Sequence, residues 1–211
     1  MLQIQGKFSP SKGTSSSQSG RSNRNREKIF NAAARLFWRK GYKRTSLNDI
    51  ARAARVNKGT IYYHFENKMA ILFEITVSAI YEIITLAQPI LEEDLEPDKK
   101  MVALIDNHVR WLISHPGRVG FYTFNKLNLT PKLFADYMKT RSAYVALFQK
   151  VIDEGVTKGT FCPINSQSDA IYIVTLLNSL VQRIDGSDQK ASEDEIVSSA
   201  SKSISRALKS N

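Results

Sequence analysis

The chain has 211 residues, with 30 Lys and Arg against 20 Asp and Glu, and therefore a formal net charge of +10. Hydrophobic residues make up 42% of the sequence and charged residues 24%, as in ordinary globular proteins, which excludes a disordered or fibrous chain. Polar residues interrupt the apolar stretches before they reach the length of a membrane-spanning helix, and the N-terminus has no signal-peptide pattern. We therefore expect a cytoplasmic protein that does not enter a membrane.

The positive charge is concentrated in the first third of the chain. Residues 1–76 carry 15 Lys and Arg against 4 Asp and Glu, whereas residues 77–211 carry 15 against 16. Such clustering is tolerated where phosphates neutralise it, which indicates a polyanion-binding module joined to a near-neutral body. A generally solvated basic surface is the alternative. One Cys and three His leave too few ligands for a zinc site, so we expect neither a metal nor an internal disulfide.

Residues 1–25 are rich in Ser, Gly and Asn and are expected to form a flexible basic tail. Residues 26–40 have the apolar spacing of a helix, with Ile29 and Ala33 on one face, and Gly41 follows as a stop. Ser46 and Asn57 are good N-caps for two further short helices. The second of these would turn Ile61 and Phe65 inward. A helix followed by a tight turn and a second short helix is suited to the DNA major groove, so residues 26–74 are expected to form a three-helix helix-turn-helix domain.

The segment from Thr45 to Leu72 closely resembles the DNA-binding segment of TetR-family transcriptional regulators, and the resemblance extends over residues 26–74. A departure occurs at Arg55, where the family often has Gly; if that position needs a positive φ, the side chain costs about 1–2 kcal/mol. The resemblance implies that Lys68 opens the next helix near the DNA backbone. It also implies that a group of neighbouring residues lies on or beside the recognition helix, namely Lys58, Gly59, Thr60, Tyr62, Tyr63 and His64.

The chemistry of these residues suits DNA contacts. Lys58 can reach a guanine edge or a phosphate, and Gly59 allows the backbone to come close to DNA. Tyr62 and His64 can donate hydrogen bonds to phosphates, Tyr63 can touch a thymine methyl group or a sugar, and Thr60 suits either a phosphate or a base edge. The start of the preceding helix favours a phosphate near Ser46 and Asn48, and Asn48 or Arg52 could also reach a base. The alternative for the aromatic residues is a small core, to which we assign Ile61 and Phe65.

The remainder of the chain is predicted to be all-α. The predicted helices span residues 68–87, 98–114, 117–127, 131–158, 166–183 and 192–209, separated mainly by prolines. By resemblance, residues 75–211 form a helical ligand-binding and dimerisation domain, in which the last two long helices form the homodimer interface. Two apolar stripes favour this interface, although each stripe could instead pack within its own subunit. The stripes comprise Ile171, Val174, Asn178 and Val181 on one helix, and Ile196, Ala200, Ile204, Ala207 and Leu208 on the other.

Aromatic residues and one cation on the middle helices suit an apolar ligand with an anionic or carbonyl end. These candidate ligand-binding residues, which could equally be plain core, are His108, Trp111, Phe121, Tyr122, Tyr137, Arg141, Tyr144 and Phe148. The stretch from Arg141 to Phe161 loosely resembles TetR-type regulators of fatty-acid or steroid breakdown that sense acyl-CoA thioesters. We therefore expect a small-molecule effector, either an apolar acid or an acyl-CoA thioester, and no cofactor.

Taken together, the sequence predicts a homodimeric repressor that binds a pseudo-palindromic double-stranded DNA operator and is released by its effector. The alternative is an architectural protein that binds DNA through charge, independently of sequence. An enzyme would have to use His108, His115, Asp106 or Cys162, and their spacing builds neither a triad nor a metal site. We therefore expect no catalytic residues.

Overall fold

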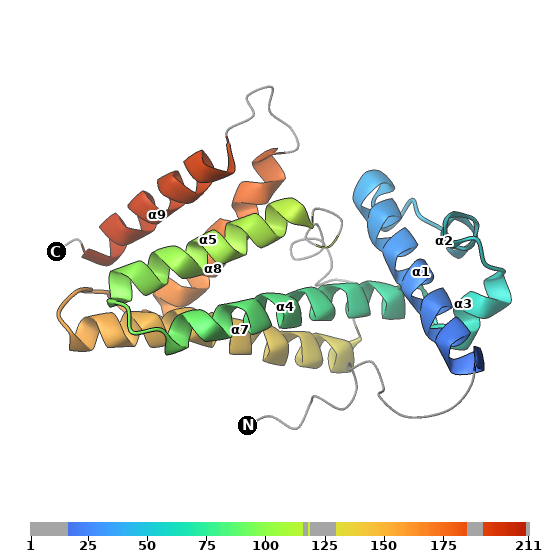
Figure 1. Cartoon of the computed structure of the whole chain (residues 1–211), viewed down its shortest axis with the longest axis horizontal. Helices are drawn as coiled ribbons and strands as arrows, with labels where there is room; N and C mark the ends of the chain where they lie inside the picture. The colour runs from blue at the N-terminus through green and yellow to red at the C-terminus, as the bar shows by residue number, and fades with distance from the viewer. Residues whose placement is uncertain (1–16, 116–117, 119–129, 185–191, 210–211) are drawn as a thin grey trace. The chain divides into compact units, whose positions relative to one another are not determined.

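The computed structural model describes residues 17–115, 118, 130–184 and 192–209, and within these residues it contains eight helices and no strand (Figure 1). The expected all-α fold is thus confirmed. The chain divides into two compact units, Met1–Ser78 and Ala79–Asn211, and the division falls inside helix α4.

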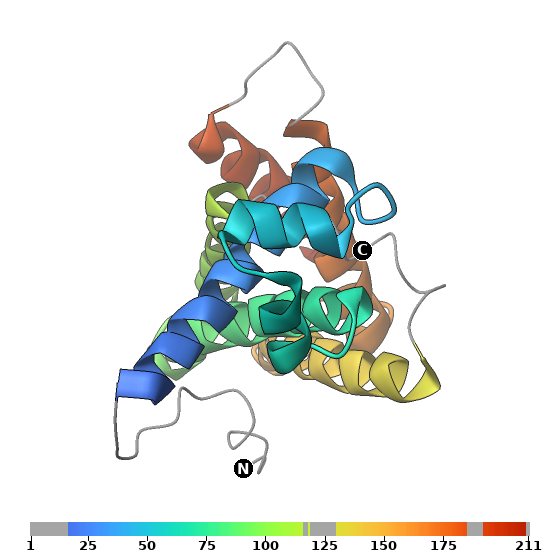
Figure 2. The same cartoon turned by 90° about the vertical axis from the view of Figure 1, so that its right-hand side faces the viewer.

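The first unit is a three-helix arrangement followed by the start of α4. It contains α1 (Ser17–Lys40), α2 (Leu47–Ala54) and α3 (Lys58–His64), and Figure 2 shows α2 crossing in front of α1. Apolar side chains from every helix meet in one core, which includes the buried residues Ile29, Phe37, Ile50, Ile61 and Ile71. Burial of these side chains fixes the positions of α2 and α3 against α1.

Helix α1 is longer at its N-terminus than the sequence predicted. The expectation of a flexible tail over residues 1–25 is wrong for residues 17–25, which are helical; residues 1–16 lie outside the described part of the chain. Once residues 26–40 are helical, each added residue gains a backbone hydrogen bond without a new nucleation cost. Arg24 Nε also donates to the carbonyl oxygen of Gly20 over 3.1 Å.

Helix α4 (Lys68–Glu92) continues through Pro89, where the sequence predicted a break after residue 87. Pro89 removes a single backbone hydrogen bond near the helix end, while Ala87 just before it is fully buried. By length and composition α4 could also cross a membrane, although 44% of its apolar window is buried inside the protein. The core helix of a soluble protein has the same properties.

The second unit is a helical bundle around α5 (Pro97–Ser114), which packs against α7 (Pro131–Thr157), α8 (Ser166–Ile184) and α9 (Glu193–Lys209). Pro97 and Pro131 occupy the first turn of α5 and α7, where a missing N–H costs nothing. The bundle core contains Leu104, Phe148 and Leu177, all fully buried. Apart from Arg118, the helix predicted for residues 117–127 lies outside the described residues.

Candidate functional sites

A capping box starts α2. The backbone N–H of Asp49 donates to Ser46 Oγ over 3.1 Å, and the Ser46 N–H donates to Asp49 Oδ2 over 3.0 Å. These hydrogen bonds from Ser46 lower the pKa of Asp49. Ser46 Oγ also donates to Asp49 Oδ2, so its proton is directed within the protein. The expected cap is confirmed, and Asn48 is exposed beside it.

The turn between α2 and α3 is strained at Arg55. This residue has φ 56° and ψ 47°, and in the described part of the chain it is the only non-glycine residue with positive φ. The Arg55 N–H donates to Arg52 O over 3.2 Å, and the next N–H, of Val56, bonds to Ala51 O over 3.0 Å. The turn therefore closes α2 with a left-handed residue. This is the positive φ for which the sequence predicted a strain at Arg55.

Helix α3 is capped by Asn57, whose Oδ1 accepts from the Thr60 N–H over 2.7 Å and from Thr60 Oγ1 over 2.8 Å. A Cβ atom added to Gly59 would lie 3.3 Å from Asn57 Oδ1. Gly59 therefore gives room to the cap as well as to an approaching backbone. Thr60 Oγ1 uses its proton on the cap, which leaves its lone pairs for another contact.

The two faces of α3 differ sharply. Ile61 is fully buried, and Phe65, just after the helix, is 4% exposed, which confirms their assignment to the core. Tyr62 and Tyr63 are 52% and 79% exposed, so neither belongs to the core. Lys58 is exposed and its Nζ lies 5.8 Å from the centre of the Tyr62 ring. Lys58, Tyr62 and Tyr63 therefore lie on the solvent side of α3, and the buried Ile61 on the other side anchors the helix to the core.

His64 lies at the edge of this surface. It contacts Tyr63 edge-on, with ring centroids 4.9 Å apart. Partial burial lowers its pKa, and the nearby Arg26 guanidinium lowers it further. Arg26 itself forms an ion pair with Glu74 and lies over the Phe65 ring. Arg26 thus joins α1 to α4.

Lys68 has a structural role that the sequence did not suggest. Its Nζ donates to Tyr42 O over 2.9 Å and to Thr45 O over 2.7 Å, and it lies 4.2 Å from the centre of the Tyr42 ring. Desolvation lowers its pKa. Two of its three donors therefore hold the loop after α1 against the start of α4, and one remains for a phosphate.

The predicted ligand-binding residues divide into several groups. His108, Tyr144 and Phe148 are buried together: His108 Nδ1 hydrogen-bonds to Tyr144 Oη over 2.7 Å, and the Tyr144 and Phe148 rings meet edge-on. Tyr137 is 8% exposed, while Arg141 reaches Thr175 Oγ1 at 3.4 Å on α8. Phe121 and Tyr122 lie outside the described residues.

The core site around His108 contains unsatisfied polar groups. In the described part of the chain, His108 Nε2 and Asn178 Oδ1 are buried without a hydrogen-bond partner of standard geometry. Burial lowers the pKa of His108 to about 4, and the Asn178 side chain opposes part of this shift. His108 is therefore neutral at physiological pH.

An open groove of about 810 Å³ lies between α4 and α5 in the second unit. Of the predicted ligand-binding residues in the described chain, Trp111 lines it, whereas His108, Tyr137, Arg141, Tyr144 and Phe148 do not. The sequence missed the apolar wall made by the partly exposed Leu86 and Val102, because an isolated exposed apolar residue has no distinctive spacing. The lining residues are Leu86, Ile90, Asp98, Lys99, Val102, Ala103, Asp106, Asn107, Arg110, Trp111, Ser114 and His115.

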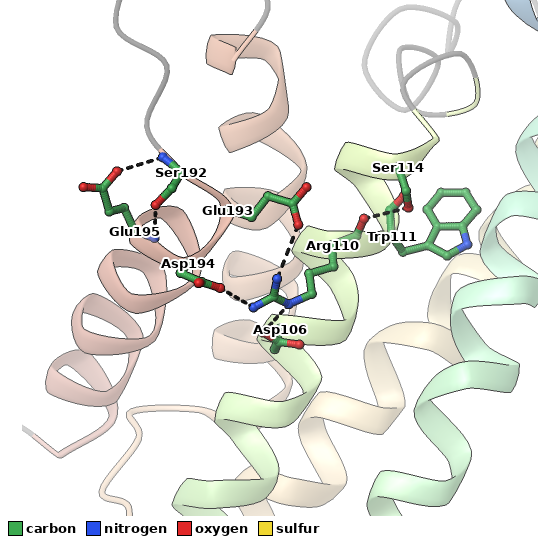
Figure 3. A network of polar contacts seen from close by, with 8 residues as sticks. All are labelled: Asp106, Arg110, Trp111, Ser114, Ser192, Glu193, Asp194 and Glu195. Carbon is green, nitrogen blue, oxygen red and sulfur yellow. Dashed lines mark hydrogen bonds and ion pairs between the residues drawn. The ribbon is translucent and has the colours of Figure 1, made fainter.

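Arg110 connects this groove to the start of α9. Its guanidinium reaches Asp106 at 2.8 Å, Glu193 at 3.3 Å and Asp194 at 2.5 Å. Figure 3 shows Arg110 on α5 between Asp106 and the two acidic residues of α9. These hydrogen bonds and charges raise the pKa of Arg110. Because the side chain is 44% exposed, the network positions the helices more than it stabilises them.

The apolar stripes predicted for dimerisation are largely internal. Val174, Ala200 and Ile204 are at most 5% exposed, so the alternative of packing within the subunit holds for them; the side chain of Val181 lies outside the described residues. Another face of α8 is exposed, with Tyr172 at 69% and Leu176 at 42%. The periodicity of an apolar stripe does not show whether the stripe packs within its own subunit or against a second subunit.

The residues considered for catalysis have other partners. Asp106 pairs with Arg110, His108 with Tyr144, and His115 stacks on Trp111 with ring centroids 4.6 Å apart. Cys162 is exposed. Among the described residues, no three His, Cys, Asp or Glu side chains form a cluster that could hold a metal ion.

Two family models match the chain: "Bacterial regulatory proteins, tetR family" over residues 29–75 and "Tetracyclin repressor-like, C-terminal domain" over residues 94–190. The transcriptional repressor KstR2 of Mycolicibacterium smegmatis is 25% identical over 148 residues, which cover 70% of this chain and 72% of KstR2.

Solved structures share the fold. A tetR-family regulatory protein from Rhodococcus RHA1 superposes with a TM-score of 0.81 at 20% identity, covering 89% of this chain and 98% of that one. FadR from Bacillus subtilis, solved in complex with stearoyl-CoA, has a TM-score of 0.75 at 19% identity, covering 86% and 98% of the two chains.

Proposed function

Because the chain belongs to the TetR family of transcriptional regulators, we propose that it is a cytoplasmic homodimeric repressor of a pseudo-palindromic operator, released by a small-molecule effector. The observation that carries this proposal is the two-sided α3. Its buried side fixes the helix in a three-helix unit, and its exposed side presents Lys58, Tyr62 and Tyr63. A helix held in this way can place the same side chains in a major groove each time.

The residues of this surface have distinct roles in the proposal. Lys58 contacts a base edge or a phosphate, and the exposed phenol of Tyr63 contacts a thymine methyl group or a sugar. Tyr62, His64 and Asn48 contact the DNA backbone and fix the register without reading sequence. Ser46, Gly59, Thr60 and Lys68 chiefly hold the local geometry, as their contacts within the protein indicate.

We propose the α4–α5 groove as the effector site, and an apolar acid or acyl-CoA thioester as the effector. The groove combines the apolar side chains of Leu86, Val102 and Trp111 with the exposed cation of Lys99, which suits a ligand with an apolar chain and one anionic end. Arg110 is already paired with Asp106, Glu193 and Asp194. FadR, whose fold is similar, was solved with stearoyl-CoA. Helix α4 contributes to both units, so a shift of α4 on effector binding would change the DNA-binding unit. A typical coupling free energy of about 1–3 kcal/mol would weaken DNA binding accordingly.

Selection of bound sequences from a randomised duplex pool tests the DNA-binding proposal. At about 150 mM salt, non-specific electrostatic binding is suppressed. We expect enrichment of an inverted repeat, because a twofold-symmetric dimer presents two recognition helices one DNA turn apart. Enrichment of no motif, with binding that persists only at low salt, would contradict this function and favour an architectural protein.

Release from the selected duplex tests the effector proposal. Stearoyl-CoA, stearic acid and coenzyme A are added separately to the complex, and the remaining binding is followed by fluorescence anisotropy. We expect stearoyl-CoA or stearic acid to release the wild type, and Val102→Glu to resist release while still binding DNA. Equal release of Val102→Glu and the wild type would place the effector elsewhere.

A further inference from the structure

A basic groove lies between α1 and the C-terminal end of α2, entirely within the first unit. Its volume is about 430 Å³. Four cations and one carboxylate line it, together with smaller side chains: Arg24, Glu27, Lys28, Asn31, Arg35, Ala53, Ala54 and Arg55. Arg24, Lys28 and Arg35 follow one another at intervals of four and seven residues, so they lie along one face of α1.

The groove cations have no acidic partner in the described part of the chain. Arg24 donates to a backbone carbonyl, and no ion pair involves Lys28, Arg35 or Arg55 among the residues that the structure describes. On the same helix, Arg26 does pair with Glu74. The gathering of unpaired cations in one groove is unfavourable unless an anion neutralises them.

The position of Arg55 also points to a function for its charge. Arg55 adopts a left-handed conformation that glycine would adopt without strain. It precedes the Asn57 cap of α3 by two residues and Lys58 by three. A cation placed at a strained position, on the wall of a basic groove, suggests that its side chain contributes binding that glycine could not.

The groove is long enough to follow a DNA strand. From Arg24 to Arg35, α1 rises by about 16 Å, and each strand of duplex DNA carries one charge per about 3.4 Å of its axis. Figure 2 shows the N-terminal end of α1 projecting beyond α2 and α3. The exposed Arg21 and Arg24 lie in this part of the helix, N-terminal to the region matched by the family model.

We infer that this basic groove binds the sugar–phosphate backbone of operator DNA outside the base pairs that α3 reads. This inference rests on the proposed function, since it assigns a second DNA contact to the same unit. Contacts of this kind add affinity and salt dependence without reading sequence. They also lengthen the stretch of duplex that each subunit needs.

The test compares Lys28→Gln/Arg35→Gln with the wild type and with a matched control. Lys139→Gln/Lys150→Gln removes the same charge from two exposed lysines of α7 in the second unit. Affinity for a 40-base-pair mixed-sequence duplex is measured against KCl concentration. We expect the negative slope of log K against log salt to become shallower by about 0.9 for each phosphate that the variant no longer neutralises, and the control to keep the wild-type slope.

Two further measurements separate binding from folding. Arg55→Gly should weaken DNA binding although its thermal midpoint is unchanged or higher, which a purely structural role would not produce. On duplexes carrying the selected motif, shortening the flanks should weaken the wild type more than Lys28→Gln/Arg35→Gln. If the groove variant matches the control at every salt concentration while the wild type binds DNA, the groove inference fails alone. If the wild type binds no duplex, the proposed function fails with it.

Discussion

Arg55 lowers the stability of the fold, and we infer that its side chain contributes to DNA binding instead. A non-glycine residue at φ 56° costs about 1–2 kcal/mol, while glycine loses more entropy on folding. We therefore expect Arg55→Gly to raise the free energy of unfolding by about 0.5–1 kcal/mol, as measured by urea denaturation. The matched control is Arg52→Gly, an exposed position inside α2, which should destabilise by about 1 kcal/mol. A decrease in the stability of Arg55→Gly would show that the side chain has stabilising contacts.

Gly155 has the opposite requirement, since it needs space and not a special backbone conformation. A Cβ atom at this helical position would overlap the ring of Phe161, which is buried. We expect Gly155→Ala to lower the free energy of unfolding by about 1–3 kcal/mol through overpacking. Gly20→Ala meets no neighbouring atom and should be neutral or slightly stabilising. Equal effects in thermal unfolding would mean that the Phe161 ring moves aside without cost.

His108 makes stability depend on pH. Its pKa falls from 6.5 to about 4 on folding, so the unfolded chain binds more protons between these values, and acid favours unfolding. The stabilisation is complete above pH 6.5 and is lost as pH falls toward 4, by about 3 kcal/mol. His108→Asn, which retains a partner for Tyr144, should remove this part of the slope in unfolding measurements from pH 7 to 4. A wild-type slope in the variant would assign the effect to other groups.

At the scale of the elements, caps could be predicted and long-range packing could not. Ser46 and Asn57 fixed the starts of α2 and α3 because a cap is a local hydrogen bond. The sequence did not predict that α1 begins at Ser17 or that α4 continues through Pro89. In both places the adjoining helical turns extend the helix although the local composition is unfavourable. The groove wall at Leu86 arises where two successive helices, α4 and α5, meet, so periodicity within one helix could not locate it.

In helix α3, substitutions at positions two residues apart should separate the effects on folding from those on DNA binding. Tyr63→Ala removes a side chain that is 79% exposed, so we expect little change in stability and weaker affinity for the selected duplex. Ile61→Ala empties a fully buried position and should destabilise by about 2–5 kcal/mol. Urea denaturation and fluorescence anisotropy on both variants provide the comparison. Wild-type affinity in Tyr63→Ala would remove this residue from the interface.

At the scale of the whole molecule, the proposed regulation requires that each unit keep its own core while sharing one helix. The DNA-binding unit buries Ile61 and Ile71, and the larger unit buries Leu104 and Phe148. Helix α4 is divided between the units, so it can transmit a displacement without either core unfolding. An effector can release DNA only if it binds the conformation with low DNA affinity more tightly than the conformation that binds the operator.

Paired recognition helices require a dimer. Leu176 is 42% exposed on α8, next to the exposed Tyr172, and neither side chain is needed for the subunit core. We expect Leu176→Glu to shift the protein toward monomers, because two desolvated carboxylates would face each other across a twofold axis. Sedimentation velocity should show the shift, and affinity for the inverted repeat should fall. Val156→Glu changes an apolar residue of α7 that is 45% exposed, and this control should remain dimeric. A dimeric Leu176→Glu variant would place the interface on another surface.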